Sequence, residues 1–224
     1  LNTGILSGDT MLILAYQYFE QYEPNIFQEL AKIFSKTAIE VCEGQQYDVD
    51  FEREAQVSTD QYLKMIAYKT AVLVGAALQM GAIIAQTSEE NKQKIYNFGL
   101  ALGIAYQLQD DYLDTFGDAS FGKKIGGDIL QNKKTLLYLK ALEKSTPEQK
   151  QELLTLYSTE PKSEEEKITR VTEFFIATES HTFLRAQVEA YTLKAFAILD
   201  TLDIPEEKKN ILKEFGSSLM NRTI

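Results

Sequence analysis

The sequence is poor in cysteine and histidine and has no long uninterrupted apolar run. Its 224 residues include one cysteine, Cys42, so no internal disulfide can form, and one histidine, His181, which alone makes no metal site. This cysteine usage fits a reducing compartment, and we expect a cytoplasmic protein. The longest apolar run, residues 71–85, is broken by Gln79 and is shorter than the ~20 residues of a membrane span. We therefore expect no membrane span.

Positive charge is also scarce. The chain has 23 Lys and Arg residues against 33 Asp and Glu residues, a formal net charge of −10. This balance argues against a nucleic-acid-binding surface, so we expect no nucleic acid partner. An acidic protein can still bind a polyanion where metal ions or a local group of basic residues reverse the sign.

What is present is helical periodicity, with no alternating stretch and no hairpin dipeptide. The four prolines stand where breaks between helices are plausible, and no composition shift suggests a linker. We predict an all-α fold and one domain over residues 1–224, large enough for one core. The predicted helices are residues 8–21, 25–46, 59–86, 90–115, 128–143, 148–158, 164–180, 182–201 and 206–220.

The helix predicted at 59–86 begins with Ser58 and Gln61 in the spacing of a capping box. It also carries small residues that would let neighbouring helices approach closely: Gly75, Ala76, Ala77, Gly81 and Ala82. We expect this helix at the centre of a bundle.

Three carboxylates end the helix predicted at 90–115. Asp110 and Asp114 lie one turn apart with Asp111 beside them, and Gly117 is a natural helix stop. Carboxylates repel one another and the negative helix C-terminus, so either one is protonated or a cation lies between them. Carboxylate oxygens suit Mg²⁺, which also takes phosphate oxygens. A solvated acidic helix end is the alternative.

A local basic segment follows the acids. Residues 120–135 contain three glycines and the lysines Lys123, Lys124, Lys133 and Lys134, against the single acid Asp128. Glycines allow backbone N–H groups to approach an anion closely. Acidic residues followed by a basic glycine-rich loop predict a site for a metal-bridged diphosphate.

Polar residues interrupt other apolar helices. Lys69 and Thr70 stand in one, and Gln107 precedes the acids in another. A lysine there reaches solvent or meets an anion, and the first is the more common outcome. Gln45 and Asp48 likewise read first as a polar helix end.

Residues 98–135 closely resemble the second aspartate-rich region of the trans-isoprenyl diphosphate synthases, the family of farnesyl and geranylgeranyl diphosphate synthases. The family pattern FQ..DD..D..GD, then GK..G.D and a lysine, is matched by Gln107, Asp110, Asp111, Asp114, Gly117, Asp118, Gly122, Lys123, Gly126, Gly127, Asp128 and Lys133. Further matches stand upstream in the family's order: ILSGDTML at 5–12, then Gly44, Gln45 and Asp48, then Lys69 and Thr70.

The resemblance implies an isoprenoid-synthase-type helical bundle around a central cavity, assembled as a homodimer. It implies a Mg²⁺-dependent prenyltransferase that condenses an allylic diphosphate with isopentenyl diphosphate to a longer trans-polyprenyl diphosphate. The segment of residues 11–19, MLILAYQYF, is apolar on nearly all sides, and we expect it to be buried or at the dimer interface.

The resemblance also assigns roles. Asp110 and Asp114 would bind Mg²⁺, supported by Asp111. Three lysines would contact the allylic diphosphate: Lys69, Lys123 and Lys133. Two side chains would turn oxygens toward the developing cation: Thr70 and Gln107. Two more would border the cavity and order its waters: Gln45 and Asp48.

The departures from the family pattern are specific. The family's first DDxxD motif and the arginine pair after it are absent, so we expect that an N-terminal third precedes these residues and that the chain alone does not turn over. Tyr106 stands where the family has Phe, and Lys124 is an alternative to Lys123 as the loop contact. A non-catalytic subunit of a heteromeric synthase and a terpene cyclase remain alternatives. Terpene cyclases lack the GK..G.D loop.

Overall fold

The computed structural model describes residues 2–54, 56–118, 124–159, 161 and 163–220, and within these ranges it contains helices and no strand. The all-α prediction is confirmed. The elements are α1 (Asn2–Gln17), α2 (Pro24–Phe51), α3 (Thr59–Ile66), the π-helical η1 (Ala67–Ala71), α4 (Val72–Ile84), α5 (Glu89–Phe116), α6 (Gly127–Leu130), α7 (Leu136–Lys144), α8 (Pro147–Ser158), α9 (Glu164–Ala177), α10 (Ser180–Asp200) and α11 (Glu206–Met220).

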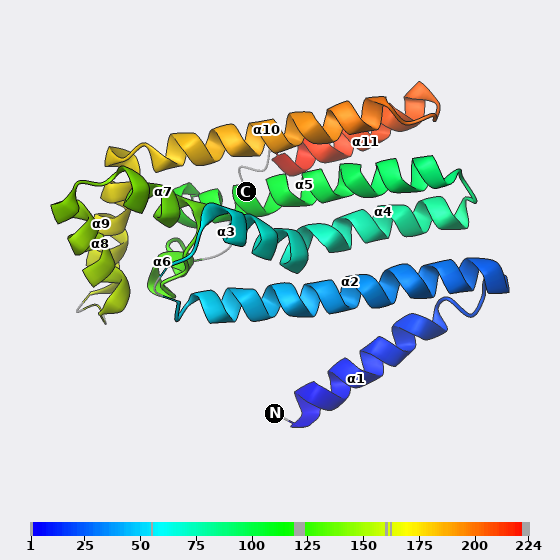
Figure 1. Ribbon diagram of the computed structural model, residues 1–224, viewed down its shortest axis with the longest axis horizontal. Helices are drawn as coiled ribbons and strands as arrows, with labels where there is room; N and C mark the ends of the chain where they lie inside the picture. The colour runs from blue at the N-terminus through cyan, green and yellow to red at the C-terminus, as the bar shows by residue number, and fades with distance from the viewer. Residues whose placement is uncertain (1, 55, 119–123, 160, 162, 221–224) are drawn as a thin grey trace.

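Helix α5 lies at the centre of the bundle. Helices α4 and α10 pack along it, and α2 packs against α4 and η1 (Figure 1). The short helices α3, α6 and α7 gather at one end, where α8 and α9 also lie (Figure 1). The core is built from apolar side chains of these facing helices, such as Phe98, Leu102 and Leu108 of α5.

Helix α1 differs from the prediction of 8–21 and diverges from the bundle (Figure 1). Its apolar side chains face outward, with Met11 69% and Ile13 62% exposed. The first part of the segment that we expected to be buried or at an interface is therefore uncovered in the single chain, whereas Tyr16 and Phe19 near its end pack against Phe34 of α2. No side chain of α1 is buried.

The prediction that the small residues of the central helix admit close neighbours holds for Gly75 but not for Gly81, where an added Cβ would have no neighbour within 4 Å. A Cβ on Gly99 would lie 2.8 Å from the Cα of Gly75, and one on Gly103 would lie 2.6 Å from the Cα of Ala71. Helices α4 and α5 therefore approach backbone to backbone. The Ser58–Gln61 capping box is present as well, with both hydrogen bonds formed.

One continuous helix was predicted over 59–86, and the structure interrupts it with η1. The π-helical turn holds Lys69 and Thr70. Such turns insert one extra residue into an α-helix and are frequent at functional sites. Together α3, η1 and α4 (Thr59–Ile84) are long and apolar enough to span a membrane by length and composition. Of the most apolar 18-residue stretch of this segment, 33% is buried. In this structure it packs within the bundle.

The helix predicted at 128–143 is wrong. Helix α6 ends at Leu130, and α7 begins only at Leu136. Asn132 adopts a left-handed conformation with φ of 56°. The N–H of Lys133 then bonds to the carbonyl of Asp128 at 2.9 Å, and that of Asn132 to Ile129 at 3.2 Å. This is a Schellman cap, which ends a helix and turns the chain.

Gly44 is the contact point between α2 and η1. A Cβ added there would lie 2.2 Å from the backbone nitrogen of Lys69. Overpacking of this kind typically costs about 1–3 kcal/mol. We expect Gly44→Ala to lower the free energy of unfolding by this amount in urea denaturation, although alanine is the better helix former.

Gly81 of α4 provides the matched control. A Cβ there has no atom within 4 Å. Gly81→Ala should raise the free energy of unfolding by up to about 1 kcal/mol, because only helix propensity changes. Equal effects of the two substitutions would show that the α2–η1 contact has no special importance.

Candidate active site

A pocket of about 500 Å³ lies at the end of the bundle where α3 and α6 meet α5. It is lined by Asp48, Phe51, Glu52, Tyr62, Met65, Ile66, Lys69, Gln107, Asp110, Asp111, Asp114, Lys124, Gly127, Asp128, Gln131, Lys133, Lys134 and Thr135. Residues up to 87 positions apart in sequence, from Asp48 to Thr135, thus face one space. Most of the polar residues singled out from the sequence are among them.

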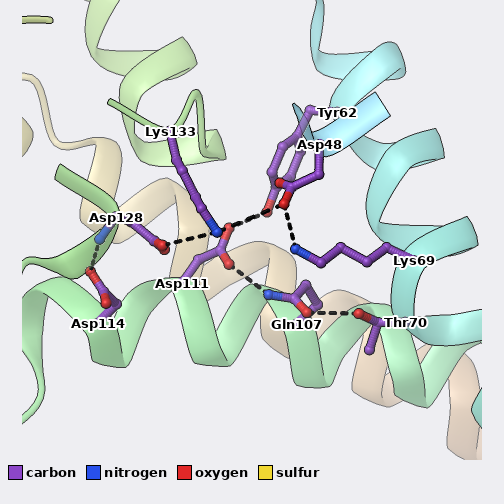
Figure 2. A network of polar contacts seen from close by, with 9 residues as sticks. All are labelled: Asp48, Tyr62, Lys69, Thr70, Gln107, Asp111, Asp114, Asp128 and Lys133. Atoms are coloured by element: carbon purple, nitrogen blue, oxygen red, sulfur yellow. Dashed lines mark hydrogen bonds and ion pairs between the residues drawn. The ribbon is translucent and has the colours of Figure 1, made fainter. Parts of the chain in front are cut away.

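Two lysines converge on one carboxylate in this pocket. The Nζ of Lys69, on η1, lies 2.7 Å from Oδ2 of Asp48 on α2. The Nζ of Lys133 lies 3.8 Å from the same oxygen and 3.7 Å from Oδ1 of Asp128. Figure 2 shows both ammonium groups between α2, α5 and the turn after α6. Lys69 therefore meets an anion, which was the less common of its two expected outcomes.

These charged groups shift one another's pKa values. Burial disfavours the charged form of Lys133, but Asp48 and Asp128 outweigh it and raise its pKa, so the ammonium is charged at neutral pH. Burial is the main cause that raises the pKa of Asp128, and Lys133 opposes it. The pocket therefore holds fixed positive charge beside carboxylates that are crowded together.

The lysines of the basic segment (residues 120–135) differ in the contacts that they make. Lys133 enters the pocket, whereas Lys134 donates hydrogen bonds to the backbone carbonyls of Phe51 and Glu54 at the end of α2. Lys124 is exposed and forms an ion pair with Glu164 of α9, although it also borders the pocket. Lys123 lies outside the described residues.

The three acids of α5 also differ. Asp111 is 5% exposed and accepts hydrogen bonds from the hydroxyl of Tyr62 and, at 2.9 Å, from Nε2 of Gln107. Oδ2 of Asp114 accepts from the backbone N–H of Asp128 at 3.0 Å (Figure 2). Asp110 lines the pocket one turn before Asp114. The helix ends at Phe116 with Gly117 as its cap, as predicted.

Burial is the main cause that raises the pKa of Asp111 to about 7; the nearby charges of Asp128 and Asp110 act in the same direction, and the hydrogen bonds from Tyr62 and Gln107 oppose the shift. The crowding that the sequence suggested is thus present. A cation in this space would relieve it.

Thr70 and Gln107 are paired, and Gln45 stands apart. Oγ1 of Thr70 donates to Oε1 of Gln107 at 2.8 Å, so Thr70 reaches the pocket wall through the glutamine (Figure 2). Gln45 is exposed and is absent from the pocket lining. Three residues along an α-helix leave it about 60° around α2 from Asp48. Its expected position in the cavity wall beside Asp48 is not reproduced, and Thr70 is likewise absent from the pocket lining.

The donor set fits a hard cation that is completed by a ligand. Six acids and four lysines line the pocket, so its own charge is negative. A Cβ on Gly127 would lie 3.1 Å from Oδ1 of Asp114, and its absence leaves room beside that carboxylate. Among the described residues no three acidic, histidine or cysteine side chains form a metal cage. Mg²⁺ typically takes only one or two carboxylates and fills its shell with phosphate oxygens and water.

Sequence reasoning missed two contributors and undervalued a third. Tyr62 is buried, and its bond to Asp111 spans 49 positions, so no local spacing indicates it. The binding of Lys134 to the end of α2 also joins distant segments. Asp128 was visible as part of the G.D pattern, and its place between Lys133 and Asp114 makes it a part of the pocket.

Comparisons with known proteins agree with this geometry. A profile of the family described as Polyprenyl synthetase matches residues 1–174. The geranylfarnesyl diphosphate synthase of Natronomonas pharaonis is 39% identical over 148 residues, covering 63% of this chain and 42% of that protein. The geranylgeranyl pyrophosphate synthase of Geoglobus acetivorans is 30% identical over 223 residues, covering 98% of this chain and 67% of that protein. The matches thus span between 42% and 67% of these two relatives.

The same likeness holds for a solved structure. A crystal structure of a geranylgeranyl pyrophosphate synthase matches with a TM-score of 0.94 and 49% sequence identity, covering 99% of this chain and 69% of that chain. The helical arrangement around the pocket is therefore shared along nearly the whole of this chain.

Proposed function

The chain belongs to the polyprenyl synthetase family, the trans-isoprenyl diphosphate synthases, and we propose that it condenses an allylic diphosphate with isopentenyl diphosphate to a longer trans-polyprenyl diphosphate. The observation that carries this proposal is that Lys69 and Lys133, whose ammonium groups meet at Asp48, line the same pocket as Asp110 and Asp114. Ammonium groups and hard oxygen donors for a cation are the two partners that a diphosphate needs.

In this reaction the carbon–oxygen bond of the allylic diphosphate breaks, and its electron pair leaves with the diphosphate. The double bond of isopentenyl diphosphate supplies the pair for the new carbon–carbon bond, and the adduct then gives a proton to the diphosphate that has left. Mg²⁺ held by Asp110 and Asp114, with Asp111 in support, would neutralise charge on the leaving diphosphate.

The chain's own residues supply the remaining functions. Lys69 and Lys133 bind and orient the diphosphate, and their fixed charge stabilises the anion that leaves. Lys123 is a third candidate for this contact. Thr70 and Gln107 present oxygens beside the reacting carbons. Asp48 holds the two lysines in place, and Gln45 precedes it by three residues on the same helix.

The apolar part of the pocket wall has a separate task. Phe51, Met65 and Ile66 line the space beside the charged groups. Side chains of this kind exclude water, which would otherwise capture an allylic cation. They also give the hydrocarbon part of the substrate an apolar surface.

We also propose a homodimer that forms through α1. Its exposed apolar side chains include Ile5, Leu6, Met11, Leu12 and Ile13. Contiguous apolar surface of this kind is typical of protein interfaces. A second copy of the chain would bury it with the same residues from both sides.

The proposed function is tested by calorimetry with a non-reactive thio-analogue of an allylic diphosphate. We expect at least about 100-fold tighter binding in Mg²⁺ than in EDTA, a difference of ~2.7 kcal/mol. Without the cation the diphosphate meets several carboxylates, and without the diphosphate the cation lacks phosphate oxygens. Inorganic pyrophosphate should bind more weakly than the analogue, because it has no hydrocarbon to bury. Equal affinity in Mg²⁺ and in EDTA would refute the proposal.

A further inference from the structure

A hydrogen-bonded network beside the pocket joins three helical elements and is buried at Tyr62 and Asp111. The hydroxyl of Tyr62, on α3, donates to Oδ2 of Asp111. Oδ1 of Asp111 accepts from Nε2 of Gln107 at 2.9 Å, and Oε1 of Gln107 accepts from Thr70 at 2.8 Å. Figure 2 shows these contacts in one line, from α3 across α5 to η1.

These hydrogen bonds determine the orientation of the side-chain amide of Gln107. An amide offers an oxygen and an NH₂ group of nearly the same shape, and it can present either one by a half turn. With NH₂ held by Oδ1 of Asp111, the carbonyl oxygen faces Thr70 and η1. The orientation therefore depends on where the Asp111 carboxylate is held.

Tyr62 is the group that holds that carboxylate. Its side chain is among the largest fully buried ones, and 1% of the residue is exposed. Asp111 is 5% exposed, so few water molecules could replace the lost donor. Without the hydroxyl, Oδ2 would lose a partner, and the carboxylate could turn away from Gln107.

We propose that Tyr62 and Asp111 form a positioning pair that keeps the carbonyl oxygen of Gln107 directed at the place where positive charge develops. Asp111 would then differ in task from Asp110 and Asp114, although the three stand together in sequence. The charge that Gln107 faces and the choice of ligand for the test rest on the proposed function, whereas the contacts between Tyr62, Asp111 and Gln107 do not.

The test compares two ligands in calorimetry with Mg²⁺. One is a bisphosphonate whose side chain carries a protonated amine, and the other is its uncharged carbon analogue. We expect Tyr62→Phe to reduce the preference for the cationic ligand about tenfold, while affinity for the neutral ligand changes less than threefold. A purely structural role for Tyr62 would weaken both ligands equally, and that result would overturn the proposal.

A double-mutant cycle shows whether Tyr62 acts through Gln107. In a Gln107→Ala background, Tyr62→Phe should leave the ligand preference unchanged, because the positioned group is already gone. A further tenfold loss in that background would contradict the proposal. Tyr138→Phe is the matched control, since this tyrosine of α7 is 2% exposed and does not line the pocket. It should leave the preference as it is.

A second measurement needs no ligand. In NMR spectra of ¹⁵N-glutamine-labelled protein, the side-chain NH₂ of Gln107 should exchange with solvent at least about tenfold faster in Tyr62→Phe than in the unmodified chain. Unchanged exchange would refute the positioning pair. If the unmodified chain bound neither bisphosphonate in Mg²⁺, the proposed function would fail, and the exchange rates would still decide the role of Tyr62.

Discussion

Asp110→Ala is expected to lower the Mg²⁺-dependent affinity for an allylic thio-diphosphate by at least about 100-fold, or ~2.7 kcal/mol. Asp110 lines the pocket one turn from Asp114, and we assign both as ligands of the cation that bridges to the diphosphate. The substitution should have the opposite sign in EDTA. There it removes one carboxylate that repels the diphosphate, so affinity should stay the same or rise slightly. Calorimetry in the two buffers measures both effects.

The control for Asp110→Ala is Asp50→Ala. Asp50 is an exposed acid at the end of α2, and its side chain bonds only to Gln46 among the contacts of the described residues. It carries the same charge but is not part of the pocket lining. Its loss should change affinity less than about threefold in either buffer. A loss of similar size for both variants would mean that overall charge, and not a local cation site, controls binding.

The substitution Lys133→Met is expected to lower the affinity for the same analogue in Mg²⁺ by about 30-fold or more. Truncating one member of a buried charge pair typically costs 2–5 kcal/mol. The ammonium group of Lys133 lies between Asp48 and Asp128, and methionine would keep the length of the side chain without the charge. The loss should appear for the thio-diphosphate and for inorganic pyrophosphate alike, because both present the same anion.

Lys124→Met tests whether the lysines of the basic segment are equivalent. Lys124 is exposed and is paired with Glu164, so its substitution should change affinity less than about threefold. If Lys124→Met were as damaging as Lys133→Met, then Lys124 would be a diphosphate contact and its ion pair would open on binding. Unchanged affinity in Lys133→Met would remove this residue from the proposed site.

Local spacing predicted the positions of the acids and their helix end. Asp110 and Asp114 share a face because four residues make about one helical turn, and the helix ends before Gly117 as expected. Gly117 is extended, with φ of −69°, and its suitability as the cap comes from lacking a Cβ, which would lie 2.4 Å from the carbonyl oxygen of Leu113. The same kind of signal was available at Asn132, where asparagine tolerates a left-handed conformation. The apolar residues that follow it favoured a continuous helix, and this pattern led to the wrong prediction for 128–143.

The contacts that individual lysines make could not be predicted from local spacing, because their partners are distant in sequence. Lys133 and Lys134 are neighbours of the same type, yet one meets Asp48 and the other meets the carbonyl of Phe51. Both partners lie more than 80 positions away in sequence, and only the packing of α2 places them there. The resemblance to a known family identified Lys133 correctly as a pocket residue, whereas the residue types alone treated all four lysines as equal.

The π-helical turn has a consequence for how this pocket can change through mutation. Because η1 takes up one extra residue in a single wider turn, α3 and α4 keep the facing that they would have in a regular α-helix without that residue. Deleting one residue of Ala67–Ala71 would therefore give a regular helix and leave Tyr62 facing Asp111. The deletion would instead take one position from the turn that holds Lys69 and Thr70. The place of these two side chains beside the pocket thus depends on the extra residue, and the place of Tyr62 does not.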